Sequence, residues 1–203
     1  GNPRAVRPGA AGLVTRRVVL VGATGAFGER LARLLAPWPE IELILAARGL
    51  ERAQALAGEL GCEAAGFDRD RPETLRELRP WAVIDAAGPF QRSAMLLPQA
   101  AIALGAHYID IADGRDFVAG FSAALDAEAR SAGVIAVTGA SSTPALSNAA
   151  LDALTVGWTR LDRVTVAISP GARAPRGLSV VRAILSYVGR PVRVFSGGRW
   201  AHE

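Results

Sequence analysis

The sequence contains no lysine, since all 23 of its basic residues are arginine. This excludes a Gly-Lys-Ser phosphate-binding loop, a Schiff-base lysine and the Tyr-x-x-x-Lys pair of short-chain dehydrogenases. The only two histidines leave no basis for a zinc site or a Ser-His-Asp triad, so we expect no metal. The single cysteine, Cys62, excludes an internal disulfide and is typical of a reducing, cytoplasmic location. We expect Cys62 to be a small buried hydrophobe rather than a nucleophile.

Long apolar runs are also lacking. None approaches the roughly 18 residues of a membrane span, and no signal-peptide pattern is present, so we expect no membrane contact. Charge is unevenly distributed: residues 18–159 carry a net charge of −6, whereas residues 160–199 carry +7. The arginines of this basic segment alternate with apolar residues and have no aromatic platform, so we expect no nucleic-acid binding. The segment is either a solvated face or a surface for an anionic substrate, cofactor or acidic partner.

The most specific pattern is a strand, a glycine-rich turn, a helix and a second strand between Arg17 and Arg48. This order is typical of the first unit of a dinucleotide-binding domain. We expect the first glycine of the turn to allow a sharp bend, the second to leave room for a pyrophosphate, and the third to let the helix pack close to the sheet. The predicted cofactor contacts of the turn are Gly22, Ala23, Thr24, Gly25, Ala26, Phe27 and Gly28.

The end of the second strand indicates which dinucleotide binds. NAD sites usually have Asp or Glu here, whereas this chain has Ala47 followed by Arg48. A guanidinium can bind a 2′-phosphate through two hydrogen bonds and can stack on adenine, so NADP is favoured over NAD. The alternative is that Arg48 caps the next helix or lies on a solvated rim.

Six alternations of strand and helix predict an α/β fold: a doubly wound parallel sheet, the Rossmann fold, with helices on both faces. We expect a loose leader at 1–15, an NAD(P)-binding domain at 16–159, and the start of a second, incomplete α+β domain at 160–203. Residues 164–168 alternate like a half-buried strand. Four apolar residues are expected on one face of the first helix (Phe27, Leu31, Leu34 and Leu35), and four are expected buried in the last part (Val166, Ile168, Ile184 and Leu185).

Ligands of such sheets bind beyond the carboxyl ends of the strands, which identifies further candidates. Asp68 either meets the adenine edge or caps a strand end. Small residues after the fourth strand allow the backbone to approach ribose and nicotinamide: Ala86, Ala87, Gly88 and Pro89. The candidates for substrate binding are Gln91, Asp113 and Ser141, although capping of a helix is the alternative for Ser141.

Other polar residues are interpreted structurally. We expect Asp116 to cap the longest helix, and His107 and Tyr108 to pack in the core with satisfied polar tips. No residue is a convincing acid–base catalyst, so the catalytic residues stay unassigned. Hydride transfer needs no protein nucleophile, because the cofactor carries that chemistry.

With these residues in place, the chain resembles the saccharopine dehydrogenase-like oxidoreductases. The resemblance rests on the glycine turn, Ala47-Arg48, Ala87-Gly88-Pro89-Phe90 and His107-Tyr108-Ile109-Asp110. It implies an NADP-binding Rossmann domain, a C-terminal domain for substrate binding and dimerisation, and hence a homodimer. It also implies hydride transfer to or from a small C–N or C–O substrate. The alternative function is a non-catalytic NADP-binding sensor or scaffold with the same fold.

Overall fold

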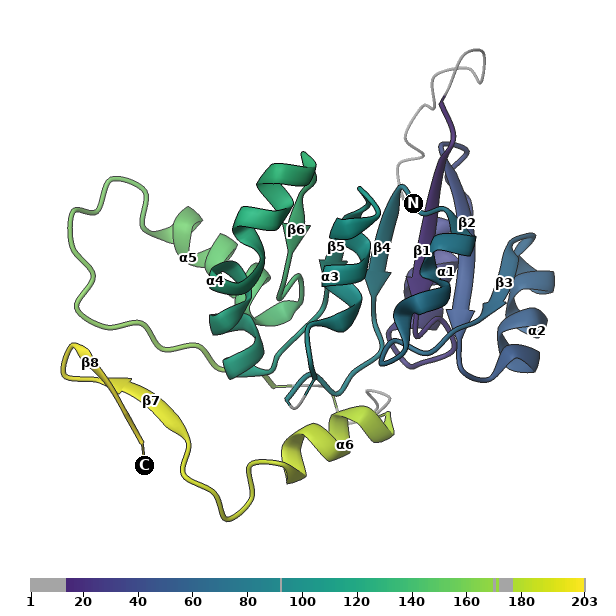
Figure 1. The fold of residues 1–203 in the computed structure, drawn as a ribbon. Coiled ribbons are helices and arrows are strands. Elements are labelled where there is room, and N and C mark those ends of the chain that lie inside the picture. The colour runs from purple at the N-terminus through teal and green to yellow at the C-terminus, as the bar shows by residue number, and fades with distance from the viewer. Residues whose placement is uncertain (1–13, 92, 170, 172–176, 203) are drawn as a thin grey trace, which may run out of the picture.

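The computed structural model describes residues 14–91, 93–169, 171 and 177–202. Six strands form one parallel sheet in the order β3-β2-β1-β4-β5-β6 (Figure 1). The strands are β1 (Arg16–Val21), β2 (Ile41–Ala47), β3 (Glu63–Gly66), β4 (Ala82–Asp85), β5 (His107–Asp110) and β6 (Ala136–Val137). The strand order reverses between β1 and β4, as in doubly wound sheets. The predicted fold class is confirmed.

The helical segments connect these strands. They are α1 (Gly28–Leu35), α2 (Leu50–Leu60), η1 (Pro72–Leu78), α3 (Leu96–Ala103), α4 (Arg115–Ala132), η2 (Ser142–Leu146), α5 (Ser147–Leu154) and α6 (Leu178–Leu185). Gly61 and Gly133 end α2 and α4 in the left-handed conformation, which glycine adopts without strain. None of the described helices is long and apolar enough to span a membrane.

The core has two layers, one on each face of the sheet. On β1, Val18 and Leu20 pack toward α1 and α2, whereas Val19 and Val21 pack toward η1, α3 and α4. This division follows from the strand geometry, because successive side chains point to opposite faces. Both faces are therefore covered by helices, so a ligand of the sheet must approach at the ends of the strands.

The last described part differs from this arrangement. An antiparallel hairpin of β7 (Arg193–Ser196) and β8 (Arg199–His202) lies apart from the large sheet (Figure 1). Residues 164–168 form no strand, so that prediction was wrong. The four residues predicted to be buried there are exposed: Val166 by 53%, Ile168 by 58%, Ile184 by 63% and Leu185 by 62%. The predicted burial of these four residues is thereby contradicted, although Gly177 beside α6 lies close to Ala26 of the Rossmann part; pairing with a second copy stays a prediction.

Smaller expectations also need correction. Phe27 and Leu34 are 51% and 67% exposed, so only Leu31 and Leu35 of the predicted apolar face are partly covered. Asp116 does not cap α4, because Gly114 occupies the N-cap position and no side chain caps the helix. Residues 1–13 of the predicted leader lie outside the described residues, and β1 begins at the predicted domain start.

Candidate functional site

The glycine turn joins β1 to α1 and packs directly on the loop after β4. Gly22 has a φ of 78°, and a Cβ on it would lie 2.8 Å from both Cα and N of Ala87. A Cβ on Gly28 would lie 2.0 Å from the Gly22 carbonyl oxygen. Gly28 thus packs against the backbone that directly follows β1, so the absence of a side chain lets the start of α1 lie close to the end of this strand. Both positions require glycine because the neighbouring atoms are backbone.

The outer side of the turn fits a pyrophosphate. Gly25 is exposed, and a Cβ there would meet only the Gly22 oxygen, at 3.1 Å. No side chain caps α1, and the positive end of its dipole lies at this turn, although the Glu29 N–H already donates to the Gly25 carbonyl oxygen (2.9 Å). Ala23 is fully buried and its N–H donates to the Ala46 carbonyl oxygen (3.2 Å), whereas Phe27 is exposed beside the turn.

Two arginines lie near this turn. Arg48 directly follows β2 and is exposed, as a residue that meets a 2′-phosphate must be. One helical turn further, the Arg52 Nη2 donates to the Thr24 carbonyl oxygen (3.2 Å). Sequence reasoning missed Arg52, although its spacing of four residues from Arg48 was the available signal.

The loop after β3 is organised by Asp68. Its Oδ1 accepts a hydrogen bond from the Asp70 N–H (3.1 Å), and its carbonyl oxygen accepts one from the Arg71 N–H (3.0 Å). These bonds form a local turn of the kind that Asp favours. The structure therefore shows Asp68 in a local turn with one carboxylate oxygen engaged by backbone, and its contact with adenine stays a prediction.

The next residue, Arg69, enters the protein and contacts the loop after β4. Its Nη2 lies 3.0 Å from Asp85 Oδ2, in an ion pair whose side chains are 9% and 0% exposed. Burial raises the pKa of Asp85, and Arg69 and the Ala87 N–H partly offset this rise. Sequence reasoning missed both residues. The signal that could have found them is a carboxylate at the end of an apolar strand, because a buried carboxylate needs a partner.

Tyr108 and Asp110 continue this buried cluster on β5. The Tyr108 hydroxyl donates to Asp85 Oδ2 (3.3 Å), and the ring is 1% exposed, which confirms its packing role. Burial, together with the carboxylates of Asp85 and Asp110, raises the pKa of Tyr108 well above its usual value. Asp110 Oδ1 accepts hydrogen bonds from three donors: the Ala112 N–H, the Thr138 hydroxyl and the Gly139 N–H, each at 2.9 Å. Asp110 thus joins the loops that follow β5 and β6.

His107, at the start of β5, also has the predicted structural role. Its Nδ1 accepts a hydrogen bond from the Ile135 N–H (3.0 Å), and its ring packs edge-on against Trp81. Cys62 is half-buried, and burial raises the pKa of its thiol, as fits an unreactive side chain.

Two of the three substrate candidates are brought together. The Gln91 Nε2 donates to Asp113 Oδ1 (3.0 Å), and a Cβ on Gly114 would lie 2.9 Å from the Phe90 carbonyl carbon. The loops after β4 and β5 are therefore in direct contact. Ser141 instead donates to the Thr143 carbonyl oxygen (2.7 Å), within its own loop.

A late segment also reaches the glycine turn. Gly177, which precedes α6, lies so close to Ala26 that a Cβ on it would be 3.4 Å from the Ala26 Cβ. Figure 1 shows α6 beside the end of the sheet where this turn lies. The cofactor contacts predicted from the sequence all precede residue 159, so Gly177 is a neighbour of the turn that was not predicted.

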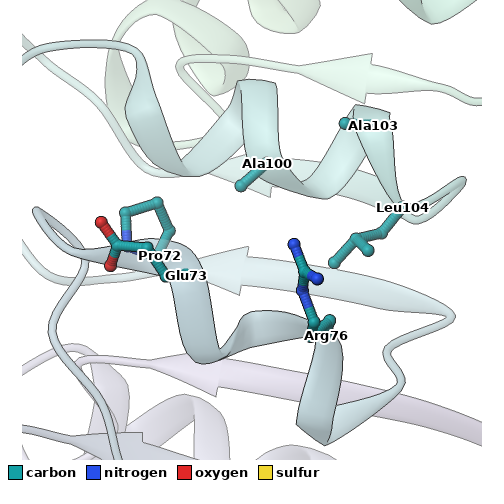
Figure 2. A pocket seen from close by; sticks show the side chains of 6 residues that line it. All are labelled: Pro72, Glu73, Arg76, Ala100, Ala103 and Leu104. Carbon is teal, nitrogen blue, oxygen red and sulfur yellow. The ribbon is translucent and has the colours of Figure 1, made fainter.

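Hollows elsewhere on the protein do not match the predicted site. One of about 220 Å³ lies between η1 and α3, with the Arg76 side chain reaching toward α3 (Figure 2). Its lining residues are Pro72, Glu73, Arg76, Ala100, Ala103 and Leu104. It is smaller than most ligand pockets and lies over a face of the sheet, so we assign it no role in cofactor binding. Among the described residues, no group of His, Cys, Asp and Glu could hold a metal ion.

Comparison with known proteins agrees with this geometry. The sequence profile of the saccharopine dehydrogenase NADP binding domain matches residues 18–137. Saccharopine dehydrogenase (L-Glu forming) from Saccharomyces cerevisiae is similar in structure, with a TM-score of 0.56 and 20% identity over 70% of this chain and 31% of that one. 3-Hydroxyacyl-CoA dehydrogenase type-2 from Mycobacterium avium has a TM-score of 0.52 and 15% identity over 64% of this chain and 74% of that one. No curated protein matches by sequence. From the 31% coverage of the yeast enzyme, this chain spans about a third of that enzyme's length.

Proposed function

The chain belongs to the family of saccharopine dehydrogenase NADP-binding domains, and from this premise we propose that it binds NADP(H). We propose that it serves an oxidoreductase that transfers hydride to or from a small C–N or C–O substrate. The cofactor would supply the hydride when bound, and the chain's residues would bind and orient it.

One observation carries this proposal. Gly22 and Ala87 lie in contact at the point where the strand order reverses. Dinucleotides bind in doubly wound sheets across this point. The pyrophosphate would lie over Gly25 and the start of α1, with Arg48 at the adenine end. Ala87 and Gly88 would then border the nicotinamide end.

Cofactor preference provides the test. Arg48→Ala removes a charge-assisted contact worth about 1.5–3 kcal/mol, which is roughly a 10- to 150-fold loss of NADP affinity. NAD affinity should change little. Arg130→Ala is the control, because it removes an exposed arginine near the opposite end of α4, where Arg130 pairs with Asp126. Calorimetric titration of both cofactors decides between the alternatives: equal losses for NAD and NADP would contradict the 2′-phosphate role.

A sensor without turnover is the second candidate, and one observation favours it. Three titratable groups of β4 and β5 are buried and therefore removed from a substrate: Asp85, Tyr108 and Asp110. Consumption of NADPH by the full-length protein with an imine or carbonyl substrate would support the oxidoreductase. Binding without turnover across a broad panel would support the sensor.

We also propose a cytoplasmic homodimer. Exposed apolar side chains in the last part of the chain support an association of copies, among them Leu154 at 78%, Val156 at 81% and Ile184 at 63% exposure. Light scattering of the full-length protein tests the dimer.

A further inference from the structure

We infer that Arg69 is a positioning residue, which holds the loop between β4 and α3 in the shape that receives the nicotinamide half of the cofactor. The inference rests on the proposed function. Arg69 follows β3, on the adenine side of the sheet. Its contacts are with the loop after β4, on the other side of the boundary between β1 and β4.

The Arg69 guanidinium binds two acceptors of this loop and the carboxylate at the end of β4, directly before the loop. Nη1 donates to the Ala87 carbonyl oxygen (2.6 Å), and Nη2 donates to the Ser93 hydroxyl oxygen (2.7 Å). The same Nη2 pairs with Asp85 Oδ2 at 3.0 Å. The guanidinium also lies over the Phe90 ring, 4.5 Å from its centre. Arg69 therefore contacts the loop near its beginning, its middle and its end.

Ala87 is fixed from both sides by this arrangement. Its carbonyl oxygen is held by Arg69, and its N–H donates to Asp85 Oδ1 (2.9 Å). On its other side the Gly22 backbone leaves no room even for a methyl group. Ala87 thus has a defined position relative to the glycine turn, and a loop ordered before binding loses less entropy when the ligand arrives.

The chemistry of the contacts requires arginine. A planar guanidinium presents several donors in a fixed fork, whereas a lysine ammonium is a single point charge on a flexible stem. Lysine at position 69 could keep a positive charge beside the buried Asp85 carboxylate. It could not also hold Ala87 and Ser93 in the same geometry. Arg69→Lys therefore keeps the positive charge beside Asp85 and removes the hydrogen bonds that hold the loop.

The test compares two ligands that share the adenine end. In the proposed site NADPH reaches both the glycine turn and the loop between β4 and α3. Adenosine 2′,5′-bisphosphate has the 2′-phosphate but no nicotinamide. We expect Arg69→Lys to lower NADPH affinity about 10-fold, as loss of charge-assisted hydrogen bonds predicts, and to leave bisphosphate affinity unchanged. Arg71→Lys is the matched control, because Arg71 is an exposed arginine of the same loop and neither affinity should change.

Hydrogen exchange gives a readout without cofactor. Peptides that cover residues 86–91 should exchange faster in Arg69→Lys, while peptides of β1 and β2 should not change. If Arg69→Lys does not fold, Ser93→Ala removes one of the three contacts and keeps the ion pair. It should accelerate exchange in the same peptides and lower NADPH affinity by a smaller factor.

The outcomes are distinguishable. Unchanged NADPH affinity and unchanged exchange in variants that fold would overturn the role of Arg69 and leave the proposed function standing. Equal losses for NADPH and the bisphosphate would also overturn it, because the effect would then lie at the adenine end. If the unmodified protein binds neither ligand, the proposed function itself is wrong, and the role of Arg69 falls with it.

Discussion

Gly28→Ala tests whether the glycine turn is as tightly packed as its geometry indicates. The added Cβ would lie 2.0 Å from the Gly22 oxygen, 2.8 Å from the Gly22 carbonyl carbon and 2.9 Å from the Ala23 Cα. All three atoms are backbone, so no side-chain rotation relieves the contact. The turn is itself held by the Gly22 N–H to the Ala46 oxygen and by the Gly25 N–H to the Gly22 oxygen, both at 2.9 Å. Relief therefore requires the start of α1 to move away from β1.

Overpacking of a tight site costs typically 1–3 kcal/mol and occasionally more, and we expect about 3 kcal/mol here because backbone must move. With a urea dependence of about 2 kcal/mol per molar, the unfolding midpoint should fall by roughly 1.5 M. NADPH binding should be lost even at low urea, because the phosphate-facing turn is displaced. Urea unfolding followed by circular dichroism, with a parallel NADPH titration, measures both effects.

Gly58→Ala is the matched control for this experiment. Gly58 lies within α2, and a Cβ there would meet nothing within 4 Å. Alanine should raise the free energy of unfolding by about 0.5–1 kcal/mol, because glycine is unfavourable within a helix. If Gly28→Ala unfolded at the midpoint of the unmodified protein and still bound NADPH, the tight packing of the turn would be refuted.

Three further predictions follow from the same structure. Gly25→Ala should lower the free energy of unfolding by no more than about 1 kcal/mol, since its Cβ would meet a single atom, the Gly22 oxygen at 3.1 Å, yet weaken NADPH binding; unchanged binding would contradict the placement of the pyrophosphate. The raised pKa of Tyr108 means that the folded state holds this proton more tightly than the unfolded chain. Stability should therefore be unaffected below the ordinary tyrosine pKa of about 10 and fall as the pH rises above it. In a Tyr187→Phe background, phenolate absorbance should appear only together with loss of circular dichroism, and phenolate in a folded protein would contradict burial. A chain ended at Thr159 should retain NADPH binding and lose self-association, which titration and light scattering would show; lost binding would mean that the Gly177 contact with Ala26 matters.

The sheet was predictable because its strands are short apolar runs, and glycines mark the turns and helix ends between them. Glycine at positions 22, 61 and 133 has positive φ in the structure, at the predicted turn and at the ends of α2 and α4. The apolar face of α1 was predicted less well. Spacing shows that Phe27 and Leu34 lie on one face of a helix, but it cannot show whether that face meets the sheet or solvent.

The remaining errors have one physical cause: the local sequence does not show which distant segments will pack against a residue. Residues 164–168 have strand periodicity, but a strand forms only against a partner, and none pairs with them among the described residues. Arg69 stands between two aspartates in a polar loop and resembles an ordinary solvated residue. Only the approach of the β3 and β4 loops buries it against Asp85.

The strand order also has a consequence for how the chain folds. β1 meets β2 after a single helix, whereas its other neighbour, β4, follows only after β2, α2, β3 and η1. Pairing β1 with β4 therefore closes the longer loop, which costs more chain entropy and slows folding. The contact of Gly22 with Ala87 cannot exist before that closure. The predicted cofactor site between the glycine turn and the loop after β4 is thus assembled by a non-local step. Its appearance during refolding should mark the point at which the two halves of the sheet have joined.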